Sequence, residues 1–201
     1  MSLLAALIPV IALGTAPVAA VPPPPEQVAA NCEAPTYASD MLVCADADLR
    51  PLDARMREAW AAVDFASVVA QEAWVEAQDA WFRRRSLCAF TERHADCLQA
   101  AYVERIAVLE ALGRVALRPA RQGLEASCPG APWGHLLVRV RAPESGALVI
   151  EDGAARVLAA ATPPVPGGAW SPYVGFKVDG SVIRLATLDG STTVCTLIAP
   201  R

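Results

Sequence analysis

The six cysteines of this chain restrict its fold more than any other feature, because they follow a segment that directs export. An apolar run from Leu3 to Leu13 is followed by the small residues Val18-Ala19-Ala20. This order predicts a signal peptide over residues 1–20, cleaved after Ala20. The run is too short to span a bilayer comfortably, and no cysteine follows it closely enough to carry a lipid anchor. We therefore expect a periplasmic or secreted protein with no stable membrane insertion after cleavage.

Cysteines of an exported chain are expected to pair as disulfides, so the six predict three bonds. A Cys128–Cys195 bond is favoured, because closing a loop of that length restricts the unfolded chain by on the order of 4 kcal/mol. In the first half, the local pairs Cys32–Cys44 and Cys88–Cys97 are favoured. A bond from Cys32 or Cys44 to the second predicted helix stays open as the alternative.

The first half of the mature chain has a helical pattern. From Asp46 to Arg114 it is rich in Ala, Arg, Glu and Leu and nearly free of Gly and Pro. Apolar residues recur at helical spacing and predict three amphipathic helices, which form a small antiparallel bundle. Trp74 and Trp81 are expected on the buried face of one helix. The arginines 83–85 are expected on a solvated face, where Arg85 can pair with a carboxylate such as Asp53.

The second half of the mature chain has a different residue composition. Gly and Pro residues from Pro119 to Pro132 break any helix, and runs of β-prone residues follow. Asp152-Gly153, Asp179-Gly180 and Asp189-Gly190 each separate two such runs, where Asp-Gly supplies the positive φ of a tight turn. Strands are predicted at 136–141, 147–151, 156–160, 173–178, 182–188 and 192–198. The sequence thus predicts an α+β protein whose second part is an antiparallel sheet or small barrel.

These patterns divide the chain into five segments. They are a signal peptide (1–20), a Pro-rich spacer (21–30), a disulfide-linked helical domain (31–116), a linker (117–127) and a β domain (128–201). The helical domain resembles the N-terminal domain of the LprI-type lysozyme inhibitors from about Asn31 to Leu112. The resemblance lies in the order and spacing of Cys32, Cys44, Leu49, Leu52-Asp53, Gln78-Asp-Ala-Trp81, Arg85, Cys88, Cys97-Leu98, Tyr102, Arg105 and Ile106.

The β domain resembles the MliC-type inhibitors of c-type lysozyme, which are small β-barrels. The resemblance lies in a leading Cys128, an Asp-Gly in mid-domain, the run Phe176-x-x-x-Gly180-x-x-x-x-Leu185 and a closing Cys195. That family carries a Ser-Gly-x-x-Tyr loop and a Lys before the Gly, which approach the lysozyme active site. Here the matching loop is 166–173, Asp179 precedes Gly180, and Lys177 stands two positions early. The resemblance implies that Ser171, Tyr173 and Lys177 bind the partner.

Motifs for catalysis or metal binding are missing from the sequence. There is no Gly-x-Ser-x-Gly, His-Glu-x-x-His or phosphate loop. His94 and His135 fall in different predicted domains and no Cys-x-x-Cys occurs, so we expect no metal site and no cofactor. A formal charge of −4 on an exported chain argues against nucleic acid as a partner.

Two functions are compatible with these features. The first is inhibition of a lysozyme, with a c-type enzyme as the expected partner, by binding and occluding its active-site cleft. The net negative charge lies N-terminal to Glu125, so the helical domain is the expected docking face for a basic enzyme. The alternative is a periplasmic binding or structural module that does not inhibit lysozyme. Neither is an enzyme.

Overall fold

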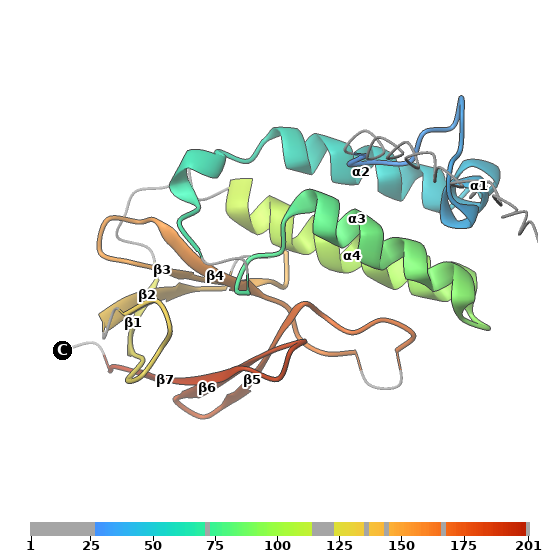
Figure 1. Ribbon diagram of the computed structural model, residues 1–201. Coiled ribbons are helices and arrows are strands. Elements are labelled where there is room, and N and C mark those ends of the chain that lie inside the picture. The colour runs from blue at the N-terminus through green and yellow to red at the C-terminus, as the bar shows by residue number, and fades with distance from the viewer. Residues whose placement is uncertain are drawn as a thin grey trace, which may run out of the picture.

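The computed structural model describes residues 27–70, 73–113, 123–134, 137–142, 145–165 and 168–199. In these residues it shows an α+β fold, with four α-helices followed by seven antiparallel strands (Figure 1). The predicted signal peptide and residues 21–26 of the predicted spacer lie outside the described residues.

The helices bury their apolar stripes against one another. Met56, Trp81, Leu98 and Leu109 are almost completely buried in one cluster, which we call the helical core. The helices are α1 (Ala38–Ala45), α2 (Leu49–Ala61), α3 (Gln78–Ser86) and α4 (His94–Gly113), with short 3₁₀ turns at η1 (Phe65–Ser67) and η2 (Leu87–Phe90). Residues three and four apart lie on the same face of a helix, so the apolar residues of each helix can point together into the helical core.

Trp74 and Trp81 do not share a helix, contrary to the expectation from their spacing. The helix α3 begins only at Gln78, and Trp81 packs in the helical core, 5.4 Å from the Tyr102 ring. Trp74 instead lies in the core of the sheet, edge-to-face with Trp133 at 5.2 Å. Its carbonyl accepts a hydrogen bond from Ala160 N. The residues 73–77 before α3 are therefore not helical, and the backbone of Trp74 supplies a partner to β4.

The sheet is nearly closed into a barrel. Its strands are β1 (Leu124–Ser127), β2 (Leu137–Arg141), β3 (Leu148–Glu151), β4 (Val157–Ala161), β5 (Val174–Asp179), β6 (Val182–Thr187) and β7 (Thr192–Leu197), in the order β4-β3-β2-β1-β7-β6-β5. A bridge between Thr162 and Gly175 joins the two edge strands, with hydrogen bonds from Thr162 N to Val174 O and from Phe176 N to Thr162 O. Pairing of the two edges in this way gives backbone N–H and C=O groups partners that an open edge would lack.

The strand β1 was not expected, since it lies inside the predicted linker at 117–127. It pairs with both β2 and β7, so it joins the two parts of the sheet. Gly123 precedes it with φ +148°, and a Cβ there would lie 2.6 Å from the Arg139 side chain. A four-residue strand after a Gly- and Pro-rich run has too little local pattern to be recognised. Its partners on both sides hold it extended.

Two of the Asp-Gly turns behave as predicted and one does not. Gly180 (φ +57°) and Gly190 (φ +87°) adopt positive φ between β5 and β6 and between β6 and β7. In the β3–β4 connection the positive φ falls on Ala155 (φ +62°) instead of Gly153. The Asp152 carboxylate explains the difference, because its Oδ1 accepts hydrogen bonds from the N–H groups of Ala154 and Arg156 and holds a wider turn.

The helices also pack against the sheet, which the prediction of a small antiparallel bundle did not include. Val108, Ala111 and Leu112 of α4 pack on Val149 and Val157 of the neighbouring strands, in a second cluster that joins the two halves. This contact explains why β3 and β4 are buried on both faces: one face lies against α4 and the other inside the sheet. Figure 1 shows the helices as one layer beside the sheet.

Three disulfides join these elements, and their pairings are the ones favoured from the sequence. They are Cys32–Cys44, Cys88–Cys97 and Cys128–Cys195, and no described cysteine is free. The first joins the chain before α1 to α1 itself, and the second joins η2 to the first turn of α4. The third joins the segment after β1 to β7. Each bond therefore restrains the chain at or beside a short helix, turn or strand.

Candidate functional site

The residues that carry the LprI resemblance lie mostly in the interior. Arg85 is fully buried, and its Nη2 lies 2.5 Å from Asp40 Oδ1. Its Nη1 donates to the Tyr102 hydroxyl (3.0 Å), which in turn donates to Asp53 Oδ1 (2.8 Å). The expectation of a solvated Arg85 was therefore wrong. Asp53 is connected to Arg85 only indirectly, through the hydroxyl of Tyr102. Burial raises the pKa of Tyr102 and keeps this hydroxyl a neutral donor.

A second buried group joins α3 to α4. Arg105 Nε donates to Gln78 Oε1 (2.8 Å), and its Nη1 donates to the carbonyl of Glu76 (2.9 Å). Burial lowers the pKa of Arg105 to about 10, which still leaves the guanidinium charged at neutral pH. These interactions tie helices to one another. The residues on which the LprI resemblance rests thus hold the helical half together and are mostly not available at the surface.

Arg84 connects the helices to the loop before β5. Its Nε and Nη2 form a bidentate pair with Glu76, both at 2.7 Å, and Nη2 also lies 3.3 Å from Glu104 Oε2. The guanidinium lies 3.8 Å from the centre of the Trp170 ring. Trp170 Nε1 donates to Glu104 Oε2 (2.9 Å). Burial raises the pKa of Glu76, although the hydrogen bonds and charge of Arg84 oppose that shift.

The three predicted partner-binding residues do not lie together. Ser171 is held by its carbonyl, which accepts from Arg84 Nη1 (2.9 Å), and Tyr173 N donates to Glu104 Oε1 (3.0 Å). Lys177 lies on β5, exposed, opposite Arg184 of β6. Four residues of extended chain separate it from Tyr173, a distance of roughly 13 Å. Ser171 and Tyr173 thus belong to the junction with the helices, and Lys177 belongs to the exposed end of β5.

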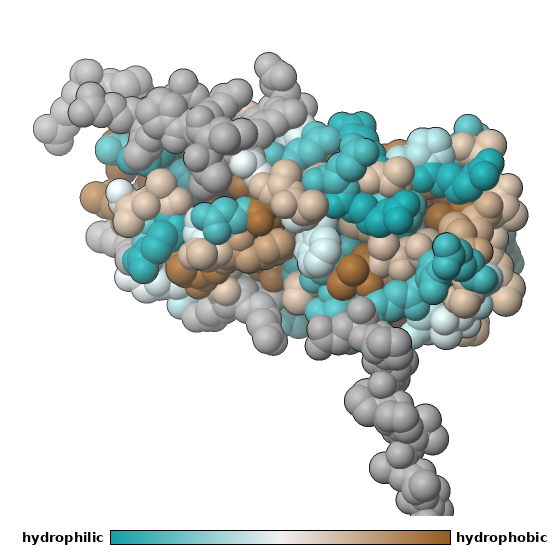
Figure 2. Space-filling model, turned by 90° about the horizontal axis from the view of Figure 1, so that it is seen from above, coloured by the Kyte–Doolittle hydropathy of each residue, from teal (hydrophilic) through white to brown (hydrophobic). Residues whose placement is uncertain are grey.

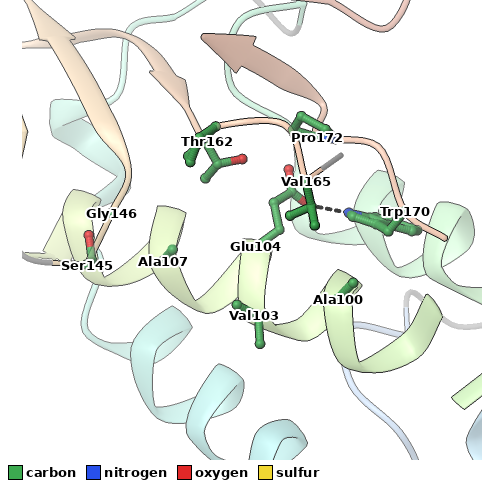
Figure 3. A pocket seen from close by; sticks show the side chains of 11 residues that line it. Ala100, Val103, Glu104, Ala107, Ser145, Gly146, Thr162, Val165, Trp170 and Pro172 are labelled. Atoms are coloured by element: carbon green, nitrogen blue, oxygen red, sulfur yellow. Dashed lines mark hydrogen bonds between the residues drawn. The ribbon is translucent and has the colours of Figure 1, made fainter. Parts of the chain in front are cut away.

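A hollow of about 180 Å³ lies between α4 and the β4–β5 connection (Figure 3). Its walls are mainly aliphatic and aromatic, with Val103 and Ala107 from α4 and Val165 and Trp170 from the connection. A second hollow of about 390 Å³ lies between α2 and α4 and shares Val103, Ala107 and Ser145 with the first. The two hollows adjoin, and together we call them the α4 groove. No sequence pattern predicts this groove, because its residues come from four separate segments.

The connection between α3 and α4 forms an exposed apolar turn, which we call the α3–α4 tip (residues 87–93). Phe90 is 86% exposed and is the most exposed large apolar side chain among the described residues. The Cys88–Cys97 disulfide pins the turn, and Thr91 bonds Cys88 O through both its N (3.0 Å) and its Oγ1 (2.9 Å). In Figure 1 the tip lies at the right-hand end of the helices, away from the strands. The disulfide and these two hydrogen bonds restrain the turn at the end of the helices.

Comparisons with family models, with curated proteins and with solved structures found no match for this chain. Among the described residues, no helix combines the length and apolarity needed to cross a membrane. Nor do the described His, Cys, Asp and Glu residues gather anywhere in a group that could hold a metal ion.

Proposed function

We propose that this chain is an exported inhibitor of a c-type lysozyme, which acts by covering the active-site cleft and not by catalysis. The two sequence resemblances support the identity of the partner. Three disulfides suit the oxidising conditions of the periplasm or the exterior.

The exposed α3–α4 tip is the observation that carries the proposal. A glycosidase cleft is concave and holds two carboxyl groups, so an inhibitor needs a rigid projection that offers apolar surface and hydrogen-bond donors. Phe90 supplies the apolar surface. Arg93, two-thirds exposed, supplies a guanidinium that can bind a carboxylate in bidentate fashion. Its present partner, Asp96, is also half-exposed, so their ion pair is weak and exchanges readily.

The charge of the helical half supports a basic partner. Residues 27–113 include 14 Asp and Glu but only 8 Arg, and no Lys. Arg84, Arg85 and Arg105 are occupied in the networks described above, whereas Glu58 and Glu92 are exposed. Figure 2, which looks onto the helices, shows hydrophilic residues interspersed with hydrophobic ones on this face. Such a surface accelerates association with a cationic enzyme in a salt-dependent way.

Lys177 is the second proposed contact, as the MliC resemblance implies. It is exposed and offers an ammonium group from a rigid strand. Ser171 and Tyr173 have a supporting part in this proposal, because Arg84 and Glu104 hold their backbone. The β-half can therefore contribute to binding through Lys177 without any movement of the loop.

Inhibition of a c-type lysozyme by the full chain tests the proposal. Phe90→Ser and Arg93→Ala are each expected to weaken inhibition by ten-fold or more, and Lys177→Ala by a smaller factor. Phe65→Ser is the matched control, because Phe65 is also exposed but lies on η1. Full-chain protein that neither binds nor inhibits any lysozyme in a panel would refute the function. Inhibition that survives all three substitutions would refute only these contacts.

A binding module without lysozyme inhibition is the second candidate function. The α4 groove favours it, because an apolar hollow with polar groups in its wall is typical of ligand sites. Binding at this groove in a chain that leaves every lysozyme active would establish it.

A further inference from the structure

Two hydroxyl groups in the wall of the α4 groove have no hydrogen-bond partner among the described residues. They are Thr162 Oγ1 and Ser145 Oγ, and both oxygen atoms are buried. Thr162 is only 5% exposed. Its backbone is fixed by the bonds that nearly close the barrel, so its side chain is held in place. Figure 3 shows this hydroxyl directed into the hollow that Val165 and Glu104 also face.

An unpartnered buried hydroxyl costs free energy unless a ligand satisfies it. Two such groups in one small apolar hollow therefore point to a ligand that carries hydrogen-bonding atoms of its own. A hydroxyl can donate and accept. The pair therefore suits a group that presents both an N–H and a C=O, as an amide does.

The charges around the hollow favour an uncharged ligand. Glu104, the one carboxylate among the described residues of the wall, already accepts from Tyr173 N, Trp170 Nε1 and Arg84 Nη2. Arg84 is in turn paired with Glu76. The described residues around the hollow thus leave no unpaired charge to attract an ion, and burying an unpaired charge beside these apolar walls would be costly.

The dimensions of the groove indicate an extended chain. A hollow of about 180 Å³ is slightly larger than the cavity of roughly 150 Å³ that holds a benzene molecule in another protein, so a side chain of the size of Leu fits it. The adjoining hollow has a larger volume, about 390 Å³. Its lining includes Arg55 and Glu110, which form an ion pair at 2.6 Å. A polar continuation of this kind suits the backbone of the residues that flank a buried side chain.

We propose that the α4 groove binds an extended, uncharged segment of another protein, seating one aliphatic side chain in the hollow while its backbone amide bonds to Thr162 and Ser145. This site is distinct from the α3–α4 tip and does not depend on lysozyme inhibition. The aliphatic residue provides affinity through burial, and the two hydroxyls select a group that carries an amide.

Titration of the full chain with the capped tripeptide acetyl-Gly-Leu-Gly-amide, followed through the methyl NMR signals of Val103, Thr162 and Val165, tests the proposal. We expect saturable shifts of these three methyl groups, with at least five-fold weaker binding of acetyl-Gly-Ser-Gly-amide. Thr162→Val keeps the shape but removes the hydroxyl, and is expected to weaken binding by five-fold or more. Thr193→Val, which is equally buried but lies on β7, is the matched control and is expected to have no effect.

Filling the hollow provides a second variant. Ala107→Leu places a larger side chain where the two hollows meet, and is expected to abolish the shifts while leaving the spectrum of the sheet intact. Binding that is unaffected by Thr162→Val and Ala107→Leu would overturn the proposal. So would tighter binding of N-acetylglucosamine than of the leucine peptide, because the amide would then belong to a sugar and not to a protein.

Discussion

The buried Arg85–Asp40 pair offers a direct test of the idea that the LprI-like residues maintain the fold. Both side chains are fully buried, and Asp40 is the only carboxylate that directly contacts the guanidinium in the described residues. Asp40→Asn keeps the shape but leaves the charge of Arg85 without a counter-charge. Removing one partner of a buried pair costs about 3–5 kcal/mol. This would be a large part of the about 5–15 kcal/mol that stabilises a typical domain.

The double substitution Asp40→Leu with Arg85→Met is expected to cost much less. It removes both charges, and the Met side chain can pack against Phe82, which lies beside the guanidinium. The Tyr102 hydroxyl keeps its bond to Asp53, while Gln27 loses an acceptor on Asp40. We expect a net cost of about 0–2 kcal/mol, because apolar replacement of a buried pair is often nearly neutral.

Urea unfolding at pH 7 with the disulfides intact measures both variants, with far-UV circular dichroism as the signal and equal m values as the test of a common mechanism. A cost below about 1 kcal/mol for Asp40→Asn would contradict the reasoning. A double variant that loses as much as its two single variants together would also contradict it, because coupled partners should not be additive. The folded double variant is further expected to keep its partner binding, since neither side chain reaches the surface.

Three further predictions concern other sites. Asp152 has a lowered pKa: burial alone would raise it, but hydrogen bonds from Arg156 and Ala154 outweigh that effect. A carboxyl with a lowered folded-state pKa stabilises the protein above its unfolded-state value and loses that contribution as the pH falls through its folded-state value. Asp152→Asn should therefore cost about 1 kcal/mol at pH 7 and less at pH 3, as pH-dependent unfolding would show; an equal cost at both would refute it. Thr162→Val should stabilise the free chain by about 1 kcal/mol in thermal unfolding, because it removes an unpartnered hydroxyl, and a destabilised variant would mean that the hydroxyl has a partner. Alkylation of the native chain without reductant should add no label by mass spectrometry, and two labelled cysteines would exclude three disulfides.

Much of the local structure could be predicted because neighbouring residues encode it. Six of the seven strands lie within a residue or two of their predicted bounds, since alternating β-prone runs are bounded by turn residues. Gly180 adopts the positive φ that its turn requires. The pairings Cys32–Cys44 and Cys88–Cys97 were favoured because each is local, and both occur. These features depend on short stretches of chain.

Other features could not be predicted, because they depend on contacts between distant segments. Trp74 lies at helical spacing from Trp81. Its carbonyl nevertheless accepts a hydrogen bond from β4, and its side chain lies in the core of the sheet. The partner of Arg85 is Asp40, which is 45 residues away and had no role in the predicted motif. No periodicity marks such pairs.

The candidate site shows the same division. The sequence determined which residues are chemically suited to binding, among them Ser171, Tyr173 and Lys177, but only the tertiary structure decided that Arg84 and Glu104 hold the first two while Lys177 stays exposed. The α4 groove exists only because α4 covers one face of the sheet and lies beside α2. Secondary structure follows from local backbone preferences and periodicity, whereas a site requires the packing of whole elements, which brings together residues that no local pattern relates.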